Sequence, residues 1–278
     1  MINLPKEWGE YWNSEKDAFK GLFKLDGPIF SEKDGRRTFR FELGGKQYFG
    51  KFHQGVGWKK IIKNILQFRR PPVLSAQNEW KAIQKLDSLG VDTMHLVGYG
   101  KRGKNPARIQ SFVITDELKK TISLENYCKD WSTNPPSQKI KNALIIKIAK
   151  VARIIHGNGF NHRDFYICHF LLDLSKGEDN IDPETLRLFL IDLHRVQIRK
   201  STPWRWRVKD ISAIMFSSMD IGLTKEDLLL FAKNYHDTTA QKSMAENKIF
   251  WWLVKRRAIG LYKKQFNKNP PDLGKLYG

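Results

Sequence analysis

The hydrophobic pattern of the chain changes from strand spacing to helical spacing, and this change limits the fold more than any other feature. Residues 38–43 alternate between apolar and polar side chains, and Gly44-Gly45 then marks a tight hairpin. In residues 137–155 the apolar side chains recur instead at the spacing of a helix. We therefore predict a mainly β unit over residues 1–116 and a mainly α unit over residues 117–278.

Within these units the same patterns predict the individual elements. The expected strands are residues 28–31, 38–43, 46–53, 96–99, 108–115, 170–174 and 186–191. The expected helices are residues 58–70, 75–88, 137–155 and most of the chain after 209. The helix at 58–70 is basic and amphipathic, and Pro71-Pro72 would end it.

The charge balance points to anionic ligands. The 278 residues, enough for about two domains at roughly 150 residues each, include 49 Lys and Arg but 29 Asp and Glu, so the net charge is +20. Such a charge attracts nucleic acid, anionic membranes or phosphorylated glycans. Two cysteines without a CxxC motif argue against a disulfide framework or a cysteine-bound zinc. We expect no signal peptide and no membrane-spanning helix, and therefore a soluble protein.

The motif His162-Arg163-Asp164 is the sharpest local signal for chemistry. It follows a helical segment that ends on Gly157 and Gly159, and it precedes a short pair of strands. This is the order of a kinase catalytic segment. A salt-bridged turn would give the same tripeptide, but the surrounding elements favour Asp164 as a catalytic base.

Three more charged residues fit the same order. Asp192 ends the apolar run 186–191, where a carboxylate needs a cation or Mg²⁺, unless it is an ordinary turn residue. Glu79 lies within the apolar stripe of its helix and needs a cation unless it reaches water at the edge of the stripe. Lys51, on the preceding strand, is the natural partner, and such a pair would hold Lys51 over nucleotide phosphates.

The rest of the expected nucleotide site departs from the protein-kinase pattern. Residues 115–118 fall where a kinase hinge would hold adenine, which makes Thr115 and Glu117 candidate ATP contacts. A glycine-rich loop is missing between the first two strands, so we expect Arg36 or Arg37 to contact phosphate. His169 stands where a metal-binding Asn is expected. It either contacts a second metal or a phosphate, or the site uses one metal.

Several blocks of sequence resemble one enzyme family. Residues 161–172 (NHRDFYICHFLL) resemble the bacterial lipopolysaccharide core heptose(I) kinases. Further matching blocks are 90–94 (GVDTM), 121–127 (TISLENY), 131–136 (WSTNPP), 191–195 (IDLHR) and 216–224 (FSSMDIGLT). The resemblance covers about residues 30–231, and Phe165 departs from it because the family usually has Cys there.

The resemblance implies a bilobal, protein-kinase-like α+β fold with an antiparallel β N-lobe and a mainly helical C-lobe. It implies transfer of phosphate from ATP to O4 of heptose I, with Mg²⁺ as cofactor. By carry-over, Asp164 is the base, Asp192 the main metal ligand and His169 the residue in the Asn position. Lys51 and Glu79 are the ion pair. Asp210 looks like the Asp at a helix start that braces the catalytic loop, although it could be a plain N-cap.

The implied acceptor is an anionic glycolipid, the lipopolysaccharide inner core, at the cytoplasmic face of the inner membrane. We therefore expect a cytoplasmic protein, peripheral to that membrane, and two basic stretches are candidate contacts: residues 58–70 and 248–268. Either could instead be an ordinary helix with a solvated basic face. The resemblance also suggests acylated acyl carrier protein as a partner.

Three other functions stay open at this point. The chain could phosphorylate another core sugar, either Kdo or heptose II. It could be an inactive kinase-fold scaffold, which the joint presence of the four charged residues argues against. It could be a basic nucleic-acid-binding protein, but no such motif stands out and we expect no nucleic acid.

Overall fold

The computed structural model describes residues 1–12, 14–33, 35–67 and 73–271. By its contacts the described chain divides into two units. The first comprises Met1–Lys85, Met94–Leu118 and Leu193–Arg195, and the second comprises Leu86–Thr93, Lys119–Asp192 and the described residues from Val196 on. A functional boundary between residues 116 and 117 stays a prediction.

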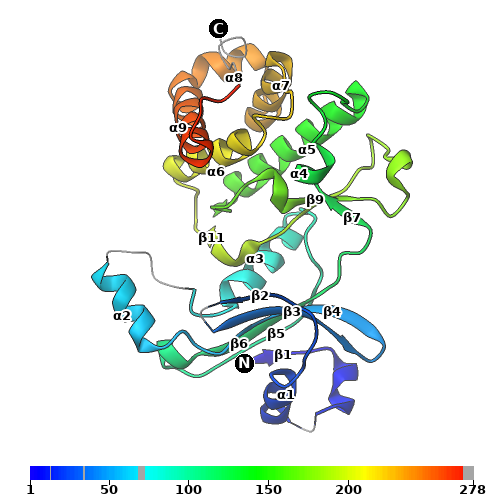
Figure 1. Ribbon diagram of the computed structural model, residues 1–278, viewed down its shortest axis with the longest axis vertical. Coiled ribbons are helices and arrows are strands. Elements are labelled where there is room, and N and C mark those ends of the chain that lie inside the picture. Colours follow the sequence, from blue (N-terminus) through cyan, green and yellow to red (C-terminus); the bar gives the residue numbers. More distant parts are fainter. Residues whose placement is uncertain (13, 34, 68–72, 272–278) are drawn as a thin grey trace. The chain divides into compact units, whose positions relative to one another are not determined.

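The first unit is built on one antiparallel sheet of six strands, in the order β1-β5-β6-β4-β3-β2 (Figure 1). Its strands are β1 (Ile2–Asn3), β2 (Ile29–Lys33), β3 (Arg36–Leu43), β4 (Lys46–His53), β5 (Leu96–Arg102) and β6 (Gln110–Asp116). Its helices are α1 (Glu15–Leu22), α2 (Trp58–Leu66) and most of α3 (Gln77–Ser88). The predicted helix at 58–70 thus ends at Leu66, and residues 68–72, where its predicted end falls, lie outside the described residues.

The two faces of this sheet differ in character. One face carries an aromatic core in which Phe39, Phe52 and Phe112 pack against Phe19 of α1. Side chains alternate along a strand, so Lys51 lies on the opposite face. There α3 packs through Trp80, whose ring stacks on Tyr99 of β5 with centroids 5.0 Å apart.

The second unit is mainly helical. Its helices are α4 (Leu124–Tyr127), α5 (Gln138–Gly157), α6 (Trp204–Ser217), α7 (Lys225–His236), α8 (Ala240–Glu246) and α9 (Lys248–Phe266). Helix α5 packs against α7, and α6 packs against α9. Two small antiparallel sheets accompany them, β10-β9-β7 and β11-β8. Their strands are β7 (Thr121–Ser123), β8 (Phe160–Asn161), β9 (Phe170–Asp173), β10 (Leu188–Leu190) and β11 (Gln197–Ile198).

Among the described residues, no helix is both long enough and apolar enough to cross a membrane.

Candidate active site

The first unit contains the predicted ion pair. Lys51 of β4 lies on the face of the sheet that α3 covers, and its Nζ is 2.5 Å from Oε1 of Glu79. Glu79 is 2 % exposed, so its carboxylate is shielded from water and depends on this lysine for charge compensation. The interpretation of Glu79 as an edge residue that reaches water is therefore wrong.

The two arginines at the start of β3 lie on opposite faces of the sheet. Arg36 pairs in register with His53, and the alternation of β4 puts His53 on the face of Lys51. Arg37 pairs with Phe52 on the aromatic face. Its guanidinium donates a hydrogen bond to the carbonyl of Leu25 and lies 4.1 Å from the Phe39 ring centroid. The predicted phosphate contact therefore falls to Arg36, and we leave Arg37 out of the proposed site.

The predicted hinge lies at the end of β6. Thr115 is buried and pairs with Phe49, on the same face as Lys51. Glu117 accepts a hydrogen bond from the guanidinium of Arg40 at 3.1 Å. Thr115 is thus paired with β4, the strand that carries Lys51, and Glu117 is engaged by an arginine of β3.

In the second unit a buried carboxylate holds the predicted catalytic loop, residues 162–164. Asp210 of α6 accepts hydrogen bonds from two successive backbone N–H groups, those of His162 at 2.7 Å and Arg163 at 2.9 Å. Arg163 has a φ of +75°, an uncommon conformation for a residue with a side chain. Asp210 therefore stabilises a strained turn immediately before Asp164.

This geometry settles the two interpretations of Asp210. Helix α6 begins at Trp204, after Pro203 at the N-cap position. Asp210 thus lies well inside the helix, so it is neither an N-cap nor a helix-start residue. Its bracing of the catalytic loop is confirmed.

His162 connects the catalytic loop to the segment that leads from β10 to Asp192. Its Nε2–H donates to the carbonyl of Ile191 at 2.9 Å. The imidazole is buried, and this burial lowers the pKa of His162 below its ordinary value. A neutral, fixed imidazole therefore connects the turn before Asp164 to Ile191, the residue before Asp192.

His169 and Asp192 approach each other beside this loop. Nδ1 of His169 is 2.6 Å from the carbonyl oxygen of Asp164, so this nitrogen carries the proton and donates it. Nε2 then faces Asp192, with 3.6 Å between it and Oδ2. A histidine that ligates a metal commonly donates its other ring N–H to a carbonyl in this way.

The side chains of Asp192 and His169 suit a single hard cation unequally. A carboxylate such as that of Asp192 suits Mg²⁺, whereas an imidazole suits it less. No group of three or more His, Cys, Asp and Glu side chains able to hold a metal occurs in the described part of the chain. Asp192 would therefore be the main protein ligand, with His169 beside it.

Phe165 follows Asp164, the predicted catalytic base, and is fully buried. Its ring packs against Phe170 at 5.2 Å and against His162 at 5.9 Å, measured between centroids. The phenylalanine therefore belongs to the core beneath the catalytic loop, where it supports the ring of His162.

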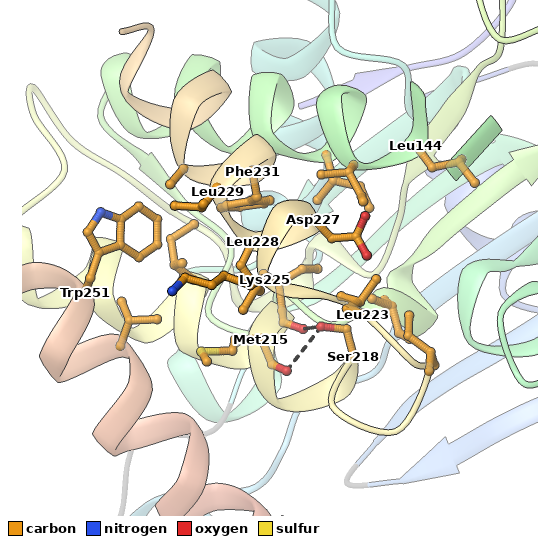
Figure 2. A pocket seen from close by; sticks show the side chains of 18 of the residues that line it. Leu144, Met215, Ser218, Leu223, Lys225, Asp227, Leu228, Leu229, Phe231 and Trp251 are labelled. Atoms are coloured by element: carbon orange, nitrogen blue, oxygen red, sulfur yellow. Dashed lines mark hydrogen bonds between the residues drawn. The ribbon is translucent and has the colours of Figure 1, made fainter. Parts of the chain in front are cut away.

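The sequence patterns did not predict a second feature of this unit, an apolar cavity of about 370 Å³. Helices α4 to α9 all contribute to its lining. Figure 2 shows Leu228, Phe231 and Trp251 among the side chains that surround it. Because the whole lining comes from several separate helices, no single stretch of sequence reveals the cavity.

The sheet with its Lys–Glu pair, and the helical unit with its braced His-Arg-Asp loop, define a protein-kinase-like fold. The profile of the lipopolysaccharide kinase (Kdo/WaaP) family matches residues 21–235. The chain belongs to this family.

The most similar relatives found agree with this. The lipopolysaccharide core heptose(I) kinase WaaP of Escherichia coli (strain K12) is 47 % identical, over 93 % of this chain and 97 % of the relative. The enzyme of the same name from Pseudomonas aeruginosa is 42 % identical, over 94 % and 96 %. A solved structure described as WaaP in complex with acyl carrier protein is 38 % identical, with a TM-score of 0.80, over 94 % of this chain and 99 % of that one.

Proposed function

We propose that this protein is a kinase that transfers the γ-phosphate of ATP to O4 of heptose I in the lipopolysaccharide inner core. The observation that carries the proposal is the catalytic loop, in which Asp210 holds the backbone immediately before Asp164 and the carbonyl of Asp164 accepts a hydrogen bond from His169. The names of the relatives support heptose I as the acceptor.

In this reaction Asp164 orients the sugar hydroxyl and accepts its proton. The hydroxyl oxygen bonds to the γ-phosphorus, and the bond from that phosphorus to the bridging oxygen of ADP breaks. Glu79 holds the ammonium of Lys51, which would offset charge on the phosphates, and Arg36 shares its face of the sheet. When bound, Mg²⁺ would neutralise phosphate charge, with Asp192 as its main ligand and His169 beside it.

The test is transfer from labelled ATP to purified lipopolysaccharide that lacks core phosphate. Asp164→Asn keeps the shape of the side chain but cannot accept a proton, so we expect kcat to fall at least about 10²- to 10⁴-fold, with a smaller change in the KM for ATP. A fully active variant would contradict the assignment. Transfer to Kdo or heptose II in the wild type would correct the acceptor, and mapping of the product would decide O4.

We further propose that the protein works at the inner face of the inner membrane and contacts it through α2. Figure 1 shows α2 standing away from the sheet, and no residue of this helix is buried. Trp58, Ile62, Ile65 and Leu66 form one apolar stripe, and each is at least half exposed. Three lysines flank the stripe and no acid lies in the helix, which is the composition of a surface-binding helix.

The second basic stretch, residues 248–268, is less suited to this role. Phe250 and Tyr262 of α9 are buried, so these two aromatic rings belong to the core of the second unit. Ile249 and Trp252 remain exposed. Two of the five aromatic side chains of this stretch are thus engaged inside the protein.

Flotation with vesicles tests the role of α2. We expect the wild type to float with phosphatidylglycerol vesicles, and Ile62→Glu/Ile65→Glu to lose most of this binding because the charges enter the apolar stripe. Ile249→Glu is the matched control, since it puts the same charge at an exposed isoleucine of α9. Loss of binding with Ile249→Glu alone would assign the contact to α9 instead.

We also propose that the partner is acylated acyl carrier protein, and that the apolar cavity receives its acyl chain. The solved relative is described as a complex with acyl carrier protein, which supports the partner. The cavity, lined largely by aliphatic and aromatic side chains, supports the acyl group. Filling the cavity with Leu228→Trp should weaken binding of the acylated carrier and leave binding of the unacylated carrier unchanged. Equal effects on both would contradict the cavity assignment.

A further inference from the structure

Two phenylalanines form a contact on the face of the first unit's sheet that carries Lys51. Phe49 comes two residues before Lys51 in β4, so strand alternation places both side chains on this face. Phe30 of β2 packs its ring against that of Phe49, with 5.0 Å between the centroids and 48° between the ring planes. Both rings lie outside the aromatic core of the opposite face, to which Phe39 and Phe52 belong. We call Phe30 and Phe49 the aromatic pair.

An irregularity in β2 turns Phe30 toward this face. β2 is an edge strand, and its register against β3 shifts between Ile29 and Ser31. Ile29 pairs with Phe39 of the aromatic core, whereas Ser31 lies on the face of Lys51. Phe30 is therefore the extra residue of a β-bulge, a feature that often re-aims a side chain beside an active site.

The aromatic pair presents apolar surface that the sheet leaves open to water. Phe30 is 59 % exposed, and Phe49 is partly exposed. Arg40 pairs in register with Phe49, and its guanidinium donates to Glu117 at the predicted hinge. The two rings thus have a polar border, and a flat apolar group that covered them would gain free energy from their removal from water.

The spacing along β4 suits a nucleotide. A strand advances about 3.3 Å per residue, so Phe49 and Lys51 lie about 7 Å apart along it. Thr115, the other predicted hinge contact, pairs in register with Phe49. In a nucleotide the ribose separates the base from the phosphates. A nucleotide whose phosphates lie at Lys51 would therefore bring its base to the aromatic pair.

We infer that the aromatic pair stacks on the nucleobase of the phosphate donor and gives the enzyme a preference for purines. This inference rests on the proposed function and adds the contact that recognises the base. A purine has two fused rings and a pyrimidine one, so a purine covers more of the pair. Because the two phenylalanine rings are tilted, a flat base that lies against one ring meets the edge of the other, and both arrangements are favourable.

The first test compares binding of ATP with binding of tripolyphosphate, which lacks the base, by calorimetry with Mg²⁺. We expect Phe30→Ala to weaken ATP binding about tenfold, the value of one stacked base, and to leave tripolyphosphate binding and the thermal midpoint near wild type. Ile29→Ala is the matched control, since Ile29 is 50 % exposed and belongs to the opposite face. Unchanged ATP binding in Phe30→Ala, or an equal loss in Ile29→Ala, would overturn the inference.

Conservative variants separate stacking from coverage by any apolar side chain. Phe30→Tyr keeps the aromatic ring and should bind ATP as the wild type does. Phe30→Leu keeps an apolar side chain without an aromatic face, so it should lose most of the affinity that Phe30→Ala loses. If Phe30→Leu binds ATP as tightly as the wild type, stacking is not the contact and the inference is wrong.

The choice of base gives a readout that a merely structural role would not change. With lipopolysaccharide as acceptor, the wild type should have a higher kcat/KM for ATP than for CTP. This ratio should fall at least about threefold in Phe30→Ala and in Phe49→Leu, because the purine loses more contact. An unchanged ratio would refute the purine preference. Failure of the wild type to bind ATP would overturn the proposed function as well, whereas wild-type binding of ATP by both variants would overturn this inference alone.

Discussion

A single buried carboxylate determines the shape of the catalytic loop. Asp210 accepts two backbone N–H groups, and an asparagine could accept one of them while its NH₂ group would face the other donor. We expect Asp210→Asn to lower the kcat about 10²-fold or more and the free energy of unfolding by about 1–3 kcal/mol, because a buried donor loses its acceptor.

Asp220→Asn is the control for this prediction. Asp220 accepts a hydrogen bond from the hydroxyl of Tyr262 at 2.8 Å, at a point separate from the catalytic loop. This variant should change stability slightly and leave kcat unaltered. Steady-state kinetics and thermal unfolding measure both effects, and equal losses of kcat in the two variants would argue against a specific role for Asp210.

The histidine at the end of β4 makes stability depend on pH. Burial, with Arg36, Lys51 and His194 nearby, lowers the pKa of His53 to about 3. The native state therefore keeps His53 neutral, whereas the unfolded chain takes up a proton below pH about 6.5. The contribution of His53 to the free energy of unfolding is therefore complete above that pH and is lost as the pH falls.

From pH 7.5 to 5.5, His53 alone should remove about 1.4 kcal/mol from the free energy of unfolding. Other histidines titrate in the unfolded chain too, so the comparison is between the wild type and His53→Gln. Urea unfolding at the two pH values should give the smaller decrease for the variant. The same decrease in both proteins would refute this source of pH dependence.

At the scale of elements, a buried ion pair joins α5 to α7. Nζ of Lys141 is 2.5 Å from Oδ2 of Asp227, and both residues are buried. Asp227 also completes the capping box of α7 with Thr224. Lys141→Met leaves the carboxylate buried without its cation, so we expect a loss of about 3 kcal/mol in the free energy of unfolding.

The double variant Lys141→Met/Asp227→Asn separates charge from packing. The introduced amide would carry no charge and its oxygen could still accept the capping hydrogen bond, so much of the lost stability should return. Urea unfolding of the single and double variants gives this coupling energy. A double variant that is less stable than Lys141→Met would mean that the pair contributes through its hydrogen bonds and not through charge compensation.

The elements that the sequence predicted well have strong local signals. The predicted strand at 46–53 coincides with β4, because the alternation and the Gly44-Gly45 turn determine its register. Helix α1 was missed. Helix α6 begins earlier than expected, directly after Pro203. Its first turns mix apolar and basic residues, so the helical spacing of apolar side chains cannot be recognised there.

The sequence predicted those parts of the candidate site whose charged residues occur along the chain in the order found in kinases. The Lys51–Glu79 pair could be inferred because a charge in an apolar stripe requires a partner. Arg37 was offered beside Arg36 as a phosphate contact, although strand alternation puts the two arginines on opposite faces and only Arg36 on the face of Lys51. The apolar cavity escaped prediction because its lining residues come from helices α4 to α9 and meet only through tertiary packing.

At the scale of the whole molecule, the net charge of +20 should guide the anionic acceptor to the protein. Screening shortens the range of this field, from about 10 Å at 0.1 M salt to about 3 Å at 1 M. We therefore expect kcat/KM for lipopolysaccharide to fall at least about tenfold over this range, while kcat at saturating acceptor changes little.

A second preparation of lipopolysaccharide, both carboxyl-reduced and dephosphorylated, serves as the comparison, because it carries no charge for the field to act on. Its kcat/KM should be lower than that of the anionic acceptor at 0.1 M salt and nearly independent of salt. Initial rates over a salt series measure both slopes. If the two acceptors lose activity in parallel, salt acts on ATP binding or on the fold, and the excess of basic residues serves another purpose than attraction of the acceptor.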